Sequence, residues 1–146
     1  MPFSAISPSL PITIFVGYSL GSITSINLGG VNIDNWLEKI KGLEQEPERS
    51  KRCGVCFYHR FCKTAKYAYE NNYLLYTSSL AISRMKDIKQ VIDSGIKAAS
   101  NFDGVNYWDY NWRKEGRVEL ASKISKTENF YRQKYCGCIF SIINKK

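Results

Sequence analysis

Hydrophobic and polar positions follow two different periodicities along the chain. In residues 34–47, 53–70, 83–100 and 116–126, apolar side chains recur every third or fourth position, which predicts helices. Between these segments, "NNYLLYTSS" and "GVNYWDYNW" combine β-forming residues with turn residues, as short strands do. Helices alternating with strands predict an α/β fold in which helices flank a small, largely parallel sheet.

The predicted helices have start signals and apolar stripes. Asp34 is the expected N-cap of the first helix, and Ser83 is the expected N-cap of the third. A turn is expected at Asp103-Gly104. The stripes expected to face the core are Trp36, Leu37, Ile40 and Leu43; Cys56, Phe61, Ala65 and Ala68; Met85, Ile88, Ile92, Ile96 and Ala99; and Val118, Ala121 and Ile124 (or Leu120).

Residues 1–33 differ from the rest because they contain no charged residue. Within them, "ITIFVGY" predicts one buried strand. A membrane span needs roughly 20 predominantly apolar residues, whereas Ser, Thr, Gly and Pro dilute every such window here and no Lys or Arg flanks it. We therefore expect no membrane segment, and we divide the chain into a divergent uncharged N-terminal segment, 1–33, and a domain, 34–146.

Charge adds a candidate partner. The chain has 21 Lys and Arg residues against 13 Asp and Glu, a formal net charge of +8, which favours a polyanionic partner, nucleic acid before membrane. The stretch "YWDYNWRKEGR" follows the second predicted strand, where ligands gather in α/β sheets. Its rings and cations suit unstacked RNA bases and phosphates, although strand aromatics are often core residues. The nucleic-acid-binding candidates are Tyr110, Trp112, Arg113, Lys114 and Arg117.

Five cysteines are too few for a disulfide scaffold, and nothing resembles a secretory signal, so a reducing cytoplasm is expected. Cys53 and Cys56 form C-x-x-C at a predicted helix start, where two sulfurs can converge on one metal and the helix dipole is expected to lower the thiol pKa. This is half a site, since zinc or an iron–sulfur cubane normally takes four ligands. The alternative to a metal site is that Cys53 and Cys56 are two partly buried thiols without a ligand. Cys62 is expected to pack in the core.

Cys136-Gly137-Cys138 is a rarer pattern. A disulfide between these cysteines closes a very small, strained ring, and strained disulfides are easily reduced. Gly137 supplies the backbone freedom that such a ring needs. A redox dithiol is one interpretation; completion of a metal site with the C-x-x-C pair competes with it, and two ordinary cysteines is the third.

Other chemistry has little support in the sequence. His59 is the only histidine, so catalysis by paired histidines and most zinc-hydrolase schemes are excluded. It is a candidate general acid or an ordinary surface residue. A phosphate-binding P-loop and the motif G-x-G-x-x-G are both missing, so nucleotide hydrolysis and a Rossmann cofactor lack support.

Four segments, in order, resemble QueH-type epoxyqueuosine reductases: "NWLEKIKGLEQEPERSKRCGVCFYHRFCKTAKYA", "YTSSLAISRMKD", "YWDYNWRKEG" and "FYRQKYCGCIFS". The resemblance extends from about Asp34 to Ser141. It implies an iron–sulfur oxidoreductase that needs no cobalamin. The implied reaction is the two-electron removal of the epoxide oxygen from epoxyqueuosine at the tRNA wobble position, which gives queuosine.

The resemblance also implies roles for the cysteines. By motif, Cys53 and Cys56 would ligate a [4Fe–4S] cluster. Cys136 and Cys138 would be the redox-active pair, or would lie against the metal site. The basic, aromatic surface would hold the tRNA anticodon loop with the modified base unstacked. The electron donor is not identified, and the proton donor is open among Tyr107, Tyr110 and His59.

The chain departs from the family pattern in one respect. The family normally begins with a strand ending in adjacent cysteines, typically "CCAPC", which supply the remaining ligands, and this chain has no cysteine before Cys53. An inactive remnant or a split reductase is therefore an alternative. A zinc-binding module that grips RNA is another.

Overall fold

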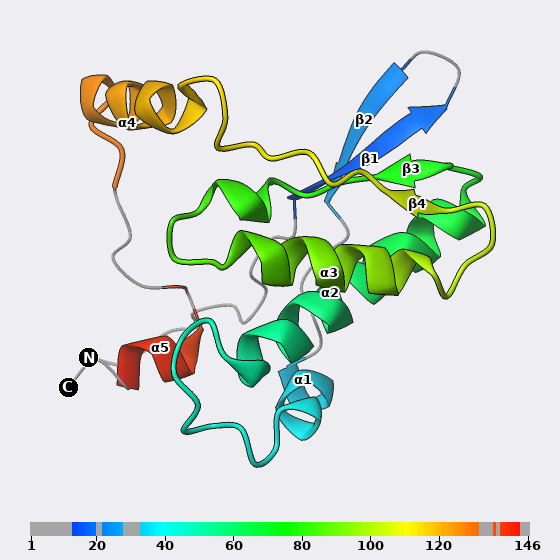
Figure 1. Ribbon diagram of the computed structural model, residues 1–146, viewed down its shortest axis with the longest axis horizontal. Coiled ribbons are helices and arrows are strands. Elements are labelled where there is room, and N and C mark those ends of the chain that lie inside the picture. Colours follow the sequence, from blue (N-terminus) through cyan, green and yellow to red (C-terminus); the bar gives the residue numbers. More distant parts are fainter. Residues whose placement is uncertain (1–12, 20–21, 28–32, 132–135, 137, 144–146) are drawn as a thin grey trace, which may run out of the picture.

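The structure, a computed structural model, describes residues 13–19, 22–27, 33–131, 136 and 138–143 (Figure 1). Its order of helices and strands confirms the predicted α/β class. In that order, the elements are β1 (Thr13–Ser19), β2 (Ser22–Asn27), α1 (Ile33–Lys39), α2 (Lys51–Glu70), β3 (Leu75–Tyr76), the 3-10 helix η1 (Ser79–Ile82), α3 (Ile88–Ala99), β4 (Asn106–Tyr107), α4 (Arg117–Thr127) and α5 (Ile139–Ile143).

The four strands form one sheet in the order β2-β1-β3-β4. The two strands expected within "NNYLLYTSS" and "GVNYWDYNW" are β3 and β4, and they pair in parallel, with Tyr76 opposite Tyr107. β1 pairs antiparallel with β2, and antiparallel with β3 through Val16 and Tyr76. The predicted short parallel sheet is thus the β3–β4 pair, and an N-terminal hairpin extends it into a mixed sheet.

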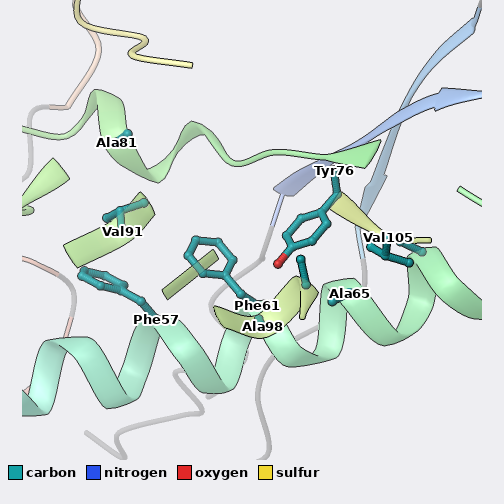
Figure 2. Packing of buried hydrophobic residues seen from close by; sticks show 10 residues of the cluster. Phe57, Phe61, Ala65, Tyr76, Ala81, Val91, Ala98 and Val105 are labelled. Atoms are coloured by element: carbon teal, nitrogen blue, oxygen red, sulfur yellow. The ribbon is translucent and has the colours of Figure 1, made fainter. Parts of the chain in front are cut away.

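Helices α2 and α3 pack against each other beneath β3 and β4 (Figure 1). The chain crosses from β3 through η1 and α3 to β4, and the expected turn at Asp103-Gly104 is confirmed, with Gly104 at φ +78°. The ring of Tyr76 points from β3 toward the two helices (Figure 2). Around it lie the other buried apolar side chains, Phe57, Phe61, Ala65, Ala68, Ala81, Val91, Ala98, Ala99 and Val105.

The two central helices confirm part of the predicted stripes. Phe61, Ala65 and Ala68 are buried on α2, but Phe57 takes the core position that was expected for the half-buried Cys56. On α3, Ala99 is buried as expected. The prediction that Ile96 faces the core is wrong, since its side chain is 49% exposed. The helix instead buries Val91, Ser94, Gly95 and Ala98, because small residues let α2 and the Tyr107 ring come close.

The predicted helix starts are also corrected. The N-cap of α3 is Asp87, whose Oδ1 accepts a hydrogen bond from the backbone N–H of Gln90 at 2.9 Å. Ser83 ends η1, and its Oγ accepts from the N–H of Met85. Asp34 lies inside the first turn of α1 rather than before it.

Helix α4 contradicts its predicted inward face. None of its residues is buried, and Leu120 and Ile124 are 57% and 47% exposed. Figure 1 shows why: α4 stands apart from the layer formed by α2 and α3. Within the part of the chain that the structure describes, no helix combines the length and the apolar character needed to cross a lipid bilayer.

Candidate cysteine site

The C-x-x-C pair lies in the first two turns of α2, as predicted. The backbone N–H of Arg49 donates to Cys53 Sγ at 3.3 Å. The side chain of Gln90, at the start of α3, donates to the carbonyls of Arg49 and Ser50 at 3.1 and 3.0 Å. The backbone that leads into α2 is therefore held in place by α3.

Helix α5, which follows the C-G-C pair, places that pair near the start of α2. Cys138 directly precedes α5, and its carbonyl accepts hydrogen bonds from the N–H and the Oγ of the buried Ser141 at 2.9 and 2.7 Å. Phe140 of α5 lies 5.9 Å from the ring of Trp36 in α1, and its ring also faces Arg52. Helix α5 is thus docked on α1 and on the start of α2, which carries the other cysteines.

Arg52 is a buried residue of α2 that contacts both the loop before α2 and helix α5. It is only 1% exposed, an unusual burial for a charged residue. Its Nη1 donates to the carbonyls of Glu44 and Glu46 in the loop before α2. Its guanidinium carbon lies 5.2 Å from the centroid of the Phe140 ring. Sequence reasoning missed this residue, because one arginine in a charged loop carries no sign that it is buried.

Electrostatics shows that the two cysteine pairs are neighbours. Burial raises the pKa of the Cys53 thiol, while the hydrogen bond from Arg49 and the charge of Arg52 lower it. The thiols of Cys136 and Cys138 both raise it further. Residues separated by about eighty positions in the sequence therefore share one environment.

Cys56 has the same neighbours. Burial raises the pKa of its thiol, the charge of Arg60 opposes that rise, and the other three thiols of the two pairs add to it. The expectation that the helix dipole lowers these pKa values is therefore wrong for Cys53 and Cys56, because desolvation outweighs it. Both are thiols rather than thiolates at neutral pH in this structure.

The donor set is incomplete for a metal. All five cysteines are described, and they are free thiols with no disulfide among them. Among the described residues, no group of three or more His, Cys, Asp or Glu side chains is placed to hold a metal ion. The predicted ligation of a [4Fe–4S] cluster or a zinc ion by Cys53 and Cys56 therefore stays a prediction. Gly137 lies outside the described residues, so the role expected of its backbone stays a prediction.

Two of the five predicted nucleic-acid residues, Tyr110 and Trp112, form an aromatic cluster with Trp108, and the ring centroids of the three are 4.9–5.5 Å apart. The guanidinium of Arg117 lies 5.5 Å from the ring of Tyr110 and 5.8 Å from that of Trp112. Trp108 is 43% exposed. Lys114 is also exposed, so this surface offers both rings and charge.

The aromatic cluster begins at the carboxyl ends of the two parallel strands, where ligand-binding residues were expected. Thr77, which follows β3, donates from its Oγ1 to the carbonyl of Trp108, which follows β4, at 2.9 Å. Arg113 differs from the other candidates, because its guanidinium donates to three backbone carbonyls at 2.6–2.7 Å. Its role in contacting RNA stays a prediction.

Two of the three candidate proton donors, Tyr107 and His59, are poorly suited to that role. Burial raises the pKa of Tyr107 to about 12, and its ring packs on Gly95 and Phe61 in the core. Burial, followed by the charges of Lys39 and Lys63, lowers the pKa of His59, so it is neutral at pH 7. His59 and Cys62 line a surface pocket of about 440 Å³. Cys62 also packs against the core, as predicted.

Comparison with known proteins gives a consistent result. The family model described as "Epoxyqueuosine reductase QueH" matches residues 21–144. A protein of that name from Acinetobacter baylyi is 52% identical over 109 residues, which are 75% of this chain and 50% of the relative.

Two further proteins carry the same name. The one from Haemophilus influenzae is 51% identical over 108 residues, 74% of this chain and 44% of the relative. The one from Thermotoga maritima is 30% identical over 114 residues, 78% of this chain and 59% of the relative. The chain therefore spans about half the length of the relatives it matches.

Proposed function

Because this chain belongs to the QueH family of epoxyqueuosine reductases, we propose that it is an oxidoreductase that works in the conversion of epoxyqueuosine to queuosine in tRNA. The observation that carries this proposal is the packing of α5, which directly follows Cys138, on the start of α2: Phe140 of α5 lies against Arg52, which directly precedes Cys53. Two cysteine pairs brought near each other in this way suit two-electron thiol chemistry.

In this proposal, Cys136 and Cys138 are the redox pair. Their two thiols supply two electrons and two protons and become a disulfide. Both C–O bonds of the epoxide break, a C=C double bond forms, and the oxygen leaves as water. An external two-electron reductant then returns the disulfide to two thiols. Desolvation of the neighbouring Cys53 and Cys56 keeps them protonated, so like charge does not accumulate beside the pair.

The RNA partner is supported by the surface beside the sheet. The exposed ring of Trp108 and the charges of Lys114 and Arg117 offer stacking and phosphate contact. The 4.9–5.5 Å spacing within the aromatic cluster holds these rings in a fixed arrangement before any base arrives. A preordered surface of this kind loses little conformational entropy when it binds.

The test is a single-turnover assay on tRNA that contains epoxyqueuosine. Anaerobically purified chain is incubated with the tRNA and either dithiothreitol or dithionite, and nucleosides are quantified by mass spectrometry. Queuosine is expected from the wild-type chain and not from Cys138→Ser, because serine cannot replace the redox thiol. Equal conversion by both proteins would contradict the assigned redox pair. No conversion by the wild-type chain would contradict the proposed activity of this chain.

A further inference from the structure

One turn of the chain contacts residues of both the cysteine site and the aromatic cluster. Residues 83–87, here called the bridging turn, connect η1 to α3. Arg49, whose backbone N–H donates to Cys53 Sγ, also donates from its Nη2 to the carbonyl of Arg84 at 2.6 Å. The bridging turn is therefore tied to the C-x-x-C cysteines through a single residue.

Arg113 holds the same turn from the other side. Its Nη2 donates to the carbonyls of Ser83 and Lys86 at 2.6 and 2.7 Å, and its Nε donates to the carbonyl of Ala81 at 2.6 Å. Arg113 directly follows Trp112 of the aromatic cluster, and its own N–H donates to Asn111 Oδ1 at 3.0 Å. Figure 1 shows the segment before α3 at the end of the molecule where α4 and α5 also lie.

We propose that Arg113 is a positioning residue, which fixes the bridging turn and thereby sets the distance between the aromatic cluster and the cysteine site. This differs from the role that the sequence predicts for it, a direct contact with RNA phosphate. Three of its N–H groups are directed at backbone carbonyls, and its side chain is half-buried. The neighbouring Lys114 is exposed and is the better phosphate contact.

The two roles make opposite demands on the side chain. A phosphate contact needs positive charge, which lysine also supplies. The three carbonyl contacts need a planar guanidinium, whose N–H groups point in fixed directions and reach carbonyls on residues 81, 83 and 86 at once. A lysine ammonium is a compact point charge and cannot span them. Arg113→Lys therefore separates the two roles.

The first experiment measures amide hydrogen exchange in the bridging turn of the full chain. Exchange at Met85 and Lys86, whose N–H groups donate to Ser83, is expected to accelerate about tenfold in Arg113→Lys, because local opening becomes easier. Lys114→Ala is the matched control and is expected to leave this exchange unchanged. Exchange in α2 shows whether either variant is globally destabilised. Unchanged exchange in Arg113→Lys would overturn the proposal.

The second experiment measures tRNA affinity over a series of salt concentrations, and it rests on the proposed function. Lys114→Ala is expected to weaken binding and to reduce the slope of log affinity against log salt by about one. Arg113→Lys is expected to weaken binding with the slope unchanged, because its charge remains. Wild-type affinity in Arg113→Lys would overturn the positioning role. Failure of every variant and the wild type to bind tRNA, with exchange altered as expected, would overturn the proposed function alone.

Discussion

The guanidinium of Arg52 lies over the ring of Phe140, with its carbon 5.2 Å from the ring centroid. Arg52 precedes Cys53 in α2, and Phe140 follows Cys138 by two residues in α5. This contact therefore joins the two halves of the cysteine site. Because the arginine is buried, the interaction is worth about 2 kcal/mol, more than at an exposed position.

Loss of this contact is expected to separate the cysteine pairs. In Phe140→Leu, the yield of cross-links by a short bismaleimide between a C-x-x-C cysteine and a C-G-C cysteine should fall several-fold, as mapped by peptide mass spectrometry. Phe140→Tyr keeps the ring and should retain the cross-link. Undiminished cross-linking in Phe140→Leu would show that α5 is held by other contacts.

Two helical glycines should respond to alanine in opposite ways. A Cβ on Gly95 would lie 2.6 Å from the ring of Tyr107, so Gly95→Ala should lower the free energy of unfolding by roughly 1–3 kcal/mol through overpacking. On Gly54 the Cβ would meet only the side chain of Gln90, at 3.8 Å. Gly54→Ala should therefore raise the free energy of unfolding by about 0.5–1 kcal/mol through helix propensity. Urea denaturation measures both, and equal effects would contradict the close α3–β4 packing.

Stability should fall at alkaline pH because of the core tyrosines. Burial raises the pKa of Tyr107 from its ordinary value of 10 to about 12 and raises that of Tyr76 as well. Between these pH values the folded state holds a proton that the unfolded state has lost, so the stabilisation is complete below pH 10 and is lost as pH rises. For Tyr107 it is on the order of 2 kcal/mol.

The measurement is urea denaturation at about pH 9 and about pH 11. Tyr107→Phe removes one of the two tyrosines whose pKa is raised, so its loss of stability between these pH values should be smaller than that of the wild type. Titration of lysines and cysteines is common to both proteins and cancels in the comparison. An equal loss in both would mean that Tyr107 is not desolvated.

Metal content tests the predicted role of Cys53. If the [4Fe–4S] cluster that the cysteine motif predicts assembles on this chain, anaerobically purified protein should contain iron, and Cys53→Ser should lose most of it because a ligand is removed. Cys62→Ser is the control, since Cys62 lies on another face of α2 and packs against the core. Zinc in place of iron would favour a structural metal site that holds the RNA-binding surface. The absence of both metals would contradict either kind of metal site.

Local pattern predicted the helices well where packing followed propensity. The stripe of Phe61, Ala65 and Ala68 faces the core as expected. The prediction for α3 was wrong at Ile96. Hydrophobicity favoured isoleucine as the buried residue, whereas the close approach of α2 and Tyr107 requires glycine and alanine on the buried face. The predicted buried face of α4 was wrong for a different reason. Amphipathic spacing indicates which face of a helix can be buried, but not whether another element packs against it.

The sequence by itself determined the α/β class, the parallel pairing of β3 with β4 and membership of the QueH family, because these depend on residue order and short-range periodicity. Only the tertiary structure decided that Cys53 and Cys56 share an environment with Cys136 and Cys138, and that desolvation raises the pKa of the first two thiols. It also decided that Arg52 and Arg113 are held by backbone carbonyls. The physical reason is that desolvation and guanidinium contacts depend on which distant segments meet, and spacing along the chain does not contain that information.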